Sequence, residues 1–193
     1  MFNIGILVFP QIEELDFIGP FEVLSYINKI QPNSTKVWLI SEDERIVQGY
    51  NGLRFFSDFN IENCPYLNVL VVPGGQGRKE AMTNKRILDF ITTRYNQLDY
   101  LVSVCTGSLI IGATGLLKGK QATTYHSAFN ELIELGGAVV ENAKVVQDGK
   151  IITGAGVSTG IDVGLYLLNQ LFNKSLAQQV LDRIEYTPRS SLW

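Results

Sequence analysis

The sequence predicts an α/β fold in which one mostly parallel sheet is covered by helices on both faces. Three observations support this class. Strand-like and helix-like segments alternate along the whole chain. Several strand-like segments are short and almost entirely apolar, which is typical of strands buried in a parallel sheet. The chain has 193 residues, 46% of them hydrophobic, without a repeat or linker, so we expect a single domain over residues 1–193.

The first part of the chain predicts two strands, a helix and a hairpin. Residues 3–9 form an apolar run and are the first expected strand. Pro20 favours a helix start, because proline is well tolerated at the first helical position, and we expect this helix over residues 20–27. A second strand is expected over residues 35–40. Residues 45–58 contain an Asn-Gly pair and predict a small hairpin.

The middle of the chain predicts two strands that are each followed by a helix. Residues 67–72 are almost continuously apolar, and a helix is expected over residues 80–95. Residues 100–104 are apolar and rich in β-branched side chains, and a helix is expected over residues 109–113. In sheets of this kind ligands bind outside the carboxyl ends of the strands. The turns after these two strands are therefore expected to face one crevice.

The last part of the chain predicts shorter elements and two closing helices. Extended segments are expected over residues 122–125, 138–148 and 150–153. Helices are expected over residues 127–135 and 176–184. Between them, a helix is expected to begin at a Ser158 or Thr159 cap and to extend to Leu168.

Composition excludes several classes of function. The net charge is −3 with a pI near 5.2, and no Lys/Arg cluster is interleaved with aromatics, so no nucleic-acid partner is expected. No apolar run is long enough to span a membrane, and the N-terminus enters a strand without a basic segment, so we expect a cytoplasmic protein. Two cysteines cannot form a disulfide framework. With one histidine, a metal site would have to gather Cys64, Cys105 and His126, and none is expected.

Cys105 is the strongest candidate for a functional side chain. It follows the strand at residues 100–104 and precedes a helix, an arrangement that resembles a nucleophile elbow. A thiol near a helix N-terminus is expected to form a thiolate more readily, and the thiolate is the nucleophile. Gly107 suits the tight backbone of such a turn. The alternative is a buried, inert cysteine at a strand end.

Two glycines after the preceding strand are candidate ligand-binding residues. Gly74 and Gly75 have no side chains to block a ligand, and their backbone N–H groups, with that of Thr106, are expected to stabilise negative charge that develops beside Cys105. The alternative is a simple tight turn between strand and helix.

Asp16 is the candidate acid/base group. It stands among apolar neighbours in the loop after the first strand, and a partly desolvated carboxyl beside a thiol is expected to have a raised pKa. A capping role is the alternative, but Asp16 precedes the expected helix start at Pro20 by too many residues. Glu13 and Glu14 are competing carboxylates.

Tyr125 and His126 are candidates for the rim of the site. His126 is the only imidazole that is available as a base for Cys105. The alternative is that His126 points to solvent at the start of a helix.

Five ordered motifs together resemble the ThiJ/PfpI superfamily, which is related to the class I glutamine amidotransferases and has a flavodoxin-like fold. The motifs are Ile6-Leu7-Val8-Phe9-Pro10 with Leu15-Asp16 and Gly19-Pro20; Val72-Pro73-Gly74-Gly75; Ser103-Val104-Cys105-Thr106-Gly107; Gly112 to Leu117 with Gly119-Lys120 and Ala122-Thr123-Thr124; and Gly154 to Asp162. Within the superfamily the motifs are most similar to those of the isonitrile hydratases.

The resemblance implies a cysteine-dependent enzyme that adds water to an isonitrile, or to a similar small C–N compound, and gives an N-substituted formamide. It implies Cys105 as nucleophile, Asp16 as its acid/base partner and Thr106 as a positioning hydroxyl, without metal or organic cofactor. It also suggests a homodimer. Isonitrile hydratases typically have His-Trp after the Ala-Thr-Thr segment, whereas this chain has Tyr125-His126. Either the imidazole is displaced by one residue or a tyrosine replaces it over the pocket.

Other functions of the superfamily stay open as alternatives. Its proteases and glyoxalases usually have a histidine directly after the nucleophile, where this chain has Thr106. A small-molecule sensor domain like that of AraC-type regulators predicts a helix-turn-helix extension of about a hundred residues, for which the sequence leaves no room. A redox-responsive protein would use the same cysteine through oxidation to the sulfenic or sulfinic state.

Overall fold

The computed structural model describes residues 1–43, 46–140 and 143–188 and confirms the mostly parallel α/β sheet. The sheet has seven strands in the order β10-β11-β7-β6-β1-β2-β5, and only β10 and β11 pair antiparallel. These strands are β1 (Phe2–Leu7), β2 (Thr35–Ser41), β5 (Phe59–Asn60), β6 (Val69–Val72), β7 (Tyr100–Ser103), β10 (Val145–Asp148) and β11 (Ile151–Gly154). The central strands β1, β6 and β7 are almost fully buried, which explains their continuous apolar sequence.

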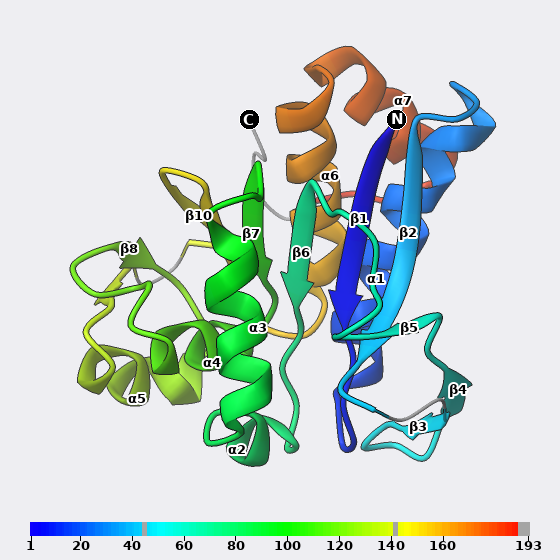
Figure 1. Cartoon of the computed structure of the whole chain (residues 1–193). Helices are drawn as coiled ribbons and strands as arrows, with labels where there is room; N and C mark the ends of the chain where they lie inside the picture. Colours follow the sequence, from blue (N-terminus) through cyan, green and yellow to red (C-terminus); the bar gives the residue numbers. More distant parts are fainter. Residues whose placement is uncertain (44–45, 141–142, 189–193) are drawn as a thin grey trace.

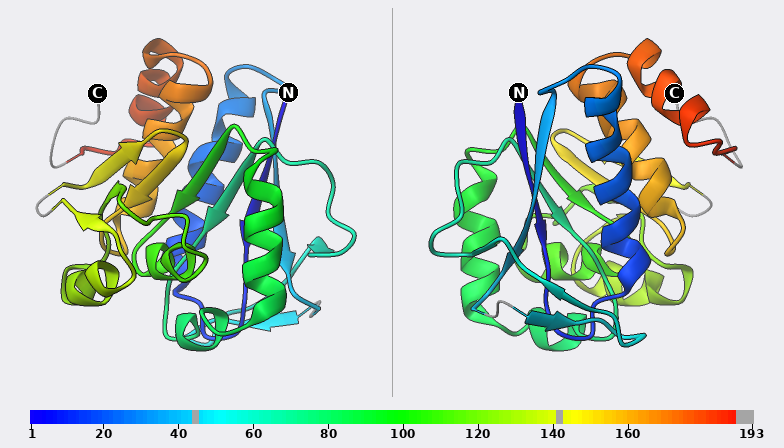
Figure 2. Two further views of the ribbon diagram at one scale, coloured as in Figure 1. Left: turned by 60° about the vertical axis from the view of Figure 1, so that its left-hand side comes forward. Right: turned by 90° about the vertical axis from the view of Figure 1, so that its right-hand side faces the viewer.

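Helices cover both faces of the sheet (Figures 1 and 2). One face carries α1 (Glu14–Tyr26), α6 (Thr159–Leu171) and α7 (Lys174–Arg183). The other face carries α3 (Lys85–Tyr95) and α4 (Gly107–Ala113), with α2 (Arg78–Ala81) and α5 (Phe129–Glu134) near the carboxyl ends of the strands. No helix among the described residues is long and apolar enough to cross a membrane.

Two small sheets lie outside the main one. Strands β3 (Ile46–Gln48) and β4 (Arg54–Phe56) form the predicted hairpin. Strands β8 (Gln121–Ala122) and β9 (Ala138–Val139) pair in parallel beside α5. Short 3₁₀ turns follow α1 and precede α5, at Ile27–Lys29 and His126–Ala128.

The chain reverses direction across the sheet between β1 and β6. From β1 it runs outward to β2 and β5, and it then returns to β6 and continues to β7 and β11. Such a reversal opens a crevice at the carboxyl ends of the two strands. The loops after β1 and β6 meet there: Glu13 N donates to the Gly74 carbonyl at 3.1 Å, and Ile12 forms an isolated bridge with Gly75.

Two helix predictions are wrong, and a third is right only in position. Helix α1 begins at Glu14 and contains Pro20 in its interior. The expected helix at residues 80–95 is divided into α2 and α3, because the Asn84 side chain accepts hydrogen bonds from Arg86 N at 3.0 Å and Ile87 N at 3.3 Å and starts a new helix. Ser158 is the N-cap residue of α6, as predicted, but its side chain makes no capping hydrogen bond.

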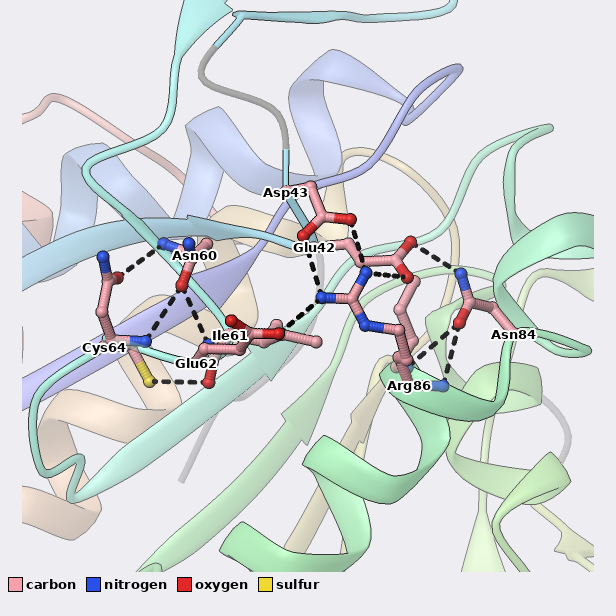
Figure 3. A network of polar contacts seen from close by, with 10 residues as sticks. Glu42, Asp43, Asn60, Ile61, Glu62, Cys64, Asn84 and Arg86 are labelled. Carbon is pink, nitrogen blue, oxygen red and sulfur yellow. Dashed lines mark hydrogen bonds and ion pairs between the residues drawn. The ribbon is translucent and has the colours of Figure 1, made fainter.

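Arg86 ties the start of α3 to the edge of the sheet. Its guanidinium forms ion pairs with Glu42, Asp43 and Glu62, and Asn84 Nδ2 donates to Glu42 Oε2 at 2.7 Å (Figure 3). These groups are largely exposed, so each pair contributes at most about 1 kcal/mol to stability. The network holds the first turn of α3 against the segments that carry Glu42 and Glu62.

Candidate active site

Cys105 occupies the predicted sharp turn between β7 and α4. Its backbone has φ +56°, in the left-handed region that residues with a Cβ rarely adopt. The surroundings hold it there: Cys105 N donates to the Gly154 carbonyl at 3.1 Å, and the Cys105 carbonyl accepts from Thr124 Oγ1 at 3.0 Å and Ser108 Oγ at 3.3 Å. A strained cysteine at a strand end is typical of a nucleophile elbow.

Glycines allow the turns after β6 and β7 to touch. A Cβ on Gly107 would lie 1.9 Å from the Val72 carbonyl oxygen, and a Cβ on Gly74 would lie 2.6 Å from Thr106 N. Neither position accepts a larger residue without moving backbone. The sequence therefore needs glycine at both positions to bring Cys105 beside the end of β6.

We predict that Gly107→Ala destabilises the fold by about 3 kcal/mol, because the added methyl group collides with backbone. The matched control is Gly112→Ala in the same helix, where the new methyl group would meet only the Leu135 side chain, at 3.0 Å. Denaturant unfolding monitored by circular dichroism compares the two. Equal stability of the two variants would contradict the close contact between the turns.

Asp16 lies in the first turn of α1, and its side chain turns toward Cys105. The prediction that Asp16 precedes the helix is wrong, because α1 starts at Glu14. The carboxyl does not cap its own helix, however. Asp16 is fully buried, Oδ2 accepts from Gly74 N at 3.0 Å, and the carboxyl interacts with the Cys105 thiol. The other carboxyl oxygen, Oδ1, is buried and has no hydrogen-bond partner among the described residues.

Burial raises the pKa of Asp16 to about 7. The hydrogen bond from Gly74 opposes this shift, and the charge of Glu13 adds to it. The expected raised pKa is therefore confirmed. A carboxyl that gains and loses its proton near neutral pH is suited to general acid/base catalysis.

The surroundings of Cys105 favour the protonated thiol over the thiolate. Burial and the Asp16 charge raise its pKa to about 12, although hydrogen bonds from the backbone and side chain of Thr106 act in the opposite direction. The expectation of a thiolate stabilised by the helix N-terminus is wrong, because desolvation and the nearby carboxylate outweigh those hydrogen bonds. Transfer of the thiol proton to Asp16 would neutralise the carboxylate, whose negative charge otherwise disfavours a thiolate at Cys105.

Gly74 and Gly75 lie beside Cys105 as predicted, but their N–H groups already have partners. Gly74 N donates to Asp16, and Gly75 N donates to Thr106 Oγ1 at 3.1 Å. The expectation that both N–H groups receive developing negative charge is therefore wrong. They instead orient the carboxyl of Asp16 and the hydroxyl of Thr106, which leaves the Thr106 O–H free to point at the sulfur.

A pocket of about 240 Å³ opens above Cys105. Its walls come from the hairpin, the loops after β1 and β6, the elbow and the loops that precede α5 and α6. The lining residues are Glu13, Tyr50, Gly75, Gln76, Arg78, Cys105, Thr106, Tyr125, Ser127 and Val157.

Tyr125 lines this pocket and His126 does not. His126 is exposed, and its ring packs on that of Tyr125 with centroids 4.3 Å apart. The hypothesis that His126 serves as a base for Cys105 is therefore wrong. A tyrosine occupies the place over the pocket, because the chain turns into a 3₁₀ segment at His126 and directs that side chain outward.

The sequence did not predict the hairpin as a pocket wall. Glu14 fixes it: the buried carboxylate accepts from Asn51 N at 2.8 Å and Asn51 Nδ2 at 2.6 Å. Burial raises the pKa of Glu14, but these hydrogen bonds and others together lower it more. The pKa of Glu14 therefore lies below its ordinary value. Tyr50 N donates to the Ile12 carbonyl at 2.8 Å, which places Tyr50 at the pocket. The Asn-Gly turn predicts the hairpin but not its docking site.

The carboxyls near the pocket thus have separate roles. Glu14 and Glu13 both accept from Asn51 Nδ2 of the hairpin, at 2.6 and 3.2 Å, and Asp16 alone of the three interacts with the thiol. Arg78, also on the pocket wall, is held by a bidentate ion pair with Glu131 of α5, with N–O distances of 3.2 and 3.1 Å. No motif in the sequence predicts Arg78 as a pocket residue, because its partner Glu131 is 53 positions away.

Comparison with known proteins identifies the family of the chain. The sequence profile of the DJ-1/PfpI family matches residues 3–170, and the chain belongs to this family. It is 42% identical over 186 residues to isonitrile hydratase of Pseudomonas putida, covering 96% of this chain and 79% of that enzyme. The crystal structure of a ThiJ/PfpI family protein from Pseudomonas syringae superposes with a TM-score of 0.89 at 33% identity, covering 98% of this chain and 76% of that one.

A transcriptional regulator is also similar. The HTH-type transcriptional regulator GbdR of Pseudomonas aeruginosa is 23% identical over 186 residues. The match covers 95% of this chain, which spans 50% of the regulator's length. Sequences similar to this chain therefore occur both in an enzyme and within a longer regulator.

Proposed function

We propose that the protein is an isonitrile hydratase that converts an isonitrile and water into an N-substituted formamide. The observation that carries the proposal is the buried Asp16 carboxyl against the Cys105 thiol at the floor of a small pocket. The similarity to the Pseudomonas putida enzyme supports the same chemistry.

The first step forms a thioimidate on Cys105. Asp16 accepts the thiol proton while the sulfur attacks the terminal carbon of the isonitrile, and Asp16 then delivers that proton to the same carbon. Sulfur and hydrogen are both added, and no group leaves. The pKa of Asp16, about 7, allows it to act as base and then as acid at neutral pH.

The second step releases the formamide. Water attacks the thioimidate carbon, one water proton reaches the nitrogen, and collapse of the tetrahedral intermediate expels Cys105 with formation of the formamide carbonyl. The departing sulfur takes up the remaining proton, with Asp16 as its relay. Thr106 N–H and O–H, which interact with the sulfur, are placed to stabilise its negative charge in both steps.

The redox-responsive alternative predicts stoichiometric oxidation of Cys105 by peroxide, without turnover of an isonitrile. Release of N-cyclohexylformamide from cyclohexyl isocyanide tests the enzyme against the sensor-like alternative. We expect many turnovers per protein molecule. Saturable binding of the isonitrile without formamide release would instead support a binding module.

We also propose that the protein is a homodimer, and the hairpin offers a surface for it. Phe55 packs on Phe17 of α1 with ring centroids 4.5 Å apart, while Ile46 and Phe56 pair across the ladder on the other face. Phe56 is 70% exposed and Ile46 56% exposed. An apolar pair that projects from a fixed hairpin is suited to contact a second copy.

We predict that Phe56→Lys shifts the protein from dimer to monomer, because the charge cannot be buried in an apolar contact. Light scattering after size-exclusion chromatography gives the mass. The control is Tyr66→Lys, an exposed aromatic outside the hairpin, whose hydroxyl donates to the Gln97 carbonyl at 3.3 Å. A wild-type monomer, or an unchanged dimer in the Phe56 variant, would contradict this interface.

A further inference from the structure

One peptide unit at the elbow is held by side chains from two different segments. The carbonyl of Cys105 accepts hydrogen bonds from Thr124 Oγ1, in the loop after β8, and from Ser108 Oγ, in α4. Thr124 and Ser108 are both fully buried. The Thr124 bond at 3.0 Å is the shorter, and it joins residues that are 19 positions apart in sequence.

The other end of this peptide unit faces the sulfur. The backbone N–H of Thr106 interacts with the Cys105 side chain and stabilises its charged form. A trans peptide is planar, with its C=O and N–H directed to opposite sides. Whatever fixes the direction of the Cys105 carbonyl therefore also fixes the direction of the Thr106 N–H.

We infer that Thr124 is a positioning residue for the nucleophile: by holding the Cys105 carbonyl, it aims the Thr106 N–H at the sulfur. The inference deepens the proposed function, since it concerns the same thiol, but it does not depend on the substrate. Thr124 does not line the pocket and is not a catalytic residue.

The backbone conformation explains why the elbow requires this support. Cys105 has φ +56°, which is unfavourable for a residue with a side chain. Because the Cys105 carbonyl lies at the entry of α4, it depends on hydroxyl donors rather than on the regular ladder of the helix. Without Thr124, we expect the peptide plane to rotate and the Thr106 N–H to leave the sulfur.

The test compares Thr124→Val with Thr124→Ser. Valine keeps the shape of threonine but removes the hydroxyl, whereas serine keeps the hydroxyl. The readout is the rate of Cys105 alkylation by iodoacetamide between pH 8 and pH 10, in a Cys64→Ser background, so that only one thiol reports. This rate follows the thiolate fraction and needs no isonitrile.

We expect alkylation of Thr124→Val to be slower than wild type by about fivefold to tenfold at every pH, as for the loss of one hydrogen bond. Thr124→Ser should restore most of the rate. With isonitrile, kcat should fall in parallel and KM should change little, because Thr124 does not touch the pocket.

A merely structural role for Thr124 predicts the opposite sign, because a loosened elbow exposes the thiol and speeds its alkylation. A folded Thr124→Val variant with an equal or faster rate would overturn the inference, and so would failure of serine to restore it. If the valine variant does not fold, Ser108→Ala removes the second donor to the same carbonyl and should slow alkylation in the same direction. A wild type that hydrates no isonitrile would refute the proposed function and leave this test intact.

Discussion

Cys105→Ala is expected to abolish formamide formation while the fold is retained. Alanine removes the sulfur, and no other nucleophilic thiol lies in the pocket. Cys105 is buried, and alanine is smaller and apolar, so the substitution introduces no clash and no unpaired polar group at this site. We expect turnover of cyclohexyl isocyanide to fall to the uncatalysed rate, with an unchanged circular dichroism spectrum.

The second cysteine provides the matched control. Cys64 is also buried, but it lies away from the pocket, and its sulfur accepts a hydrogen bond from Arg94 Nη2 at 3.0 Å. Cys64→Ser keeps an acceptor at that place and should retain wild-type turnover. Activity that survives in Cys105→Ala, or that is lost in Cys64→Ser, would show that the reaction does not use the elbow thiol.

Asp16→Asn is expected to reduce kcat/KM by about a hundredfold or more, as loss of a general acid/base group does. Asparagine keeps the size of the side chain and an oxygen that can accept from Gly74 N. It cannot take the thiol proton, however, and the raised pKa of Cys105 makes that transfer necessary at neutral pH. A fully active Asp16→Asn enzyme would remove Asp16 from the mechanism.

The pH profile gives a second readout for Asp16. Burial raises its pKa to about 7, so the carboxyl is protonated below that pH and cannot act as base. We expect wild-type kcat/KM to fall as the pH drops through about 7 and to reach a plateau above it. In Asp16→Asn this acid limb should be absent. In Glu13→Gln it should move to lower pH, because the Glu13 charge contributes to the raised pKa of Asp16.

The local pattern of the sequence predicts the sheet and the elbow because both depend on neighbouring residues. An apolar strand followed by Cys105 and Gly107 leaves the backbone of the turn few conformations. The sharp turn is present in the structure, with φ +56° at Cys105. The glycines after β6 are predicted as neighbours of Cys105 for another reason, because the carboxyl ends of adjacent parallel strands lie at the same edge of the sheet. The start of α1 was not predicted, because Pro20 also fits a helix interior when the surrounding turns are held by packing.

The electrostatics of the site could not be predicted from the local pattern. The helix N-terminus favours a thiolate, but the pKa of Cys105 depends on burial and on Asp16, which is distant in sequence. The same applies to the Gly74 and Gly75 N–H groups, whose partners come from other segments. The directions of Tyr125 and His126 depend on a 3₁₀ turn that no residue pattern marks.

The mass of the Cys105 peptide during turnover tests the central claim most directly. Wild type is mixed with cyclohexyl isocyanide, quenched with acid at intervals, digested and examined by mass spectrometry beside Cys105→Ala and beside Asp16→Asn, which should form the adduct more slowly. The proposed addition has no leaving group, so the Cys105 peptide should transiently gain the full mass of the isonitrile while formamide accumulates. Formamide release by wild type and Cys105→Ala at the same rate, with Cys105 unmodified at every interval, would contradict covalent catalysis by this thiol.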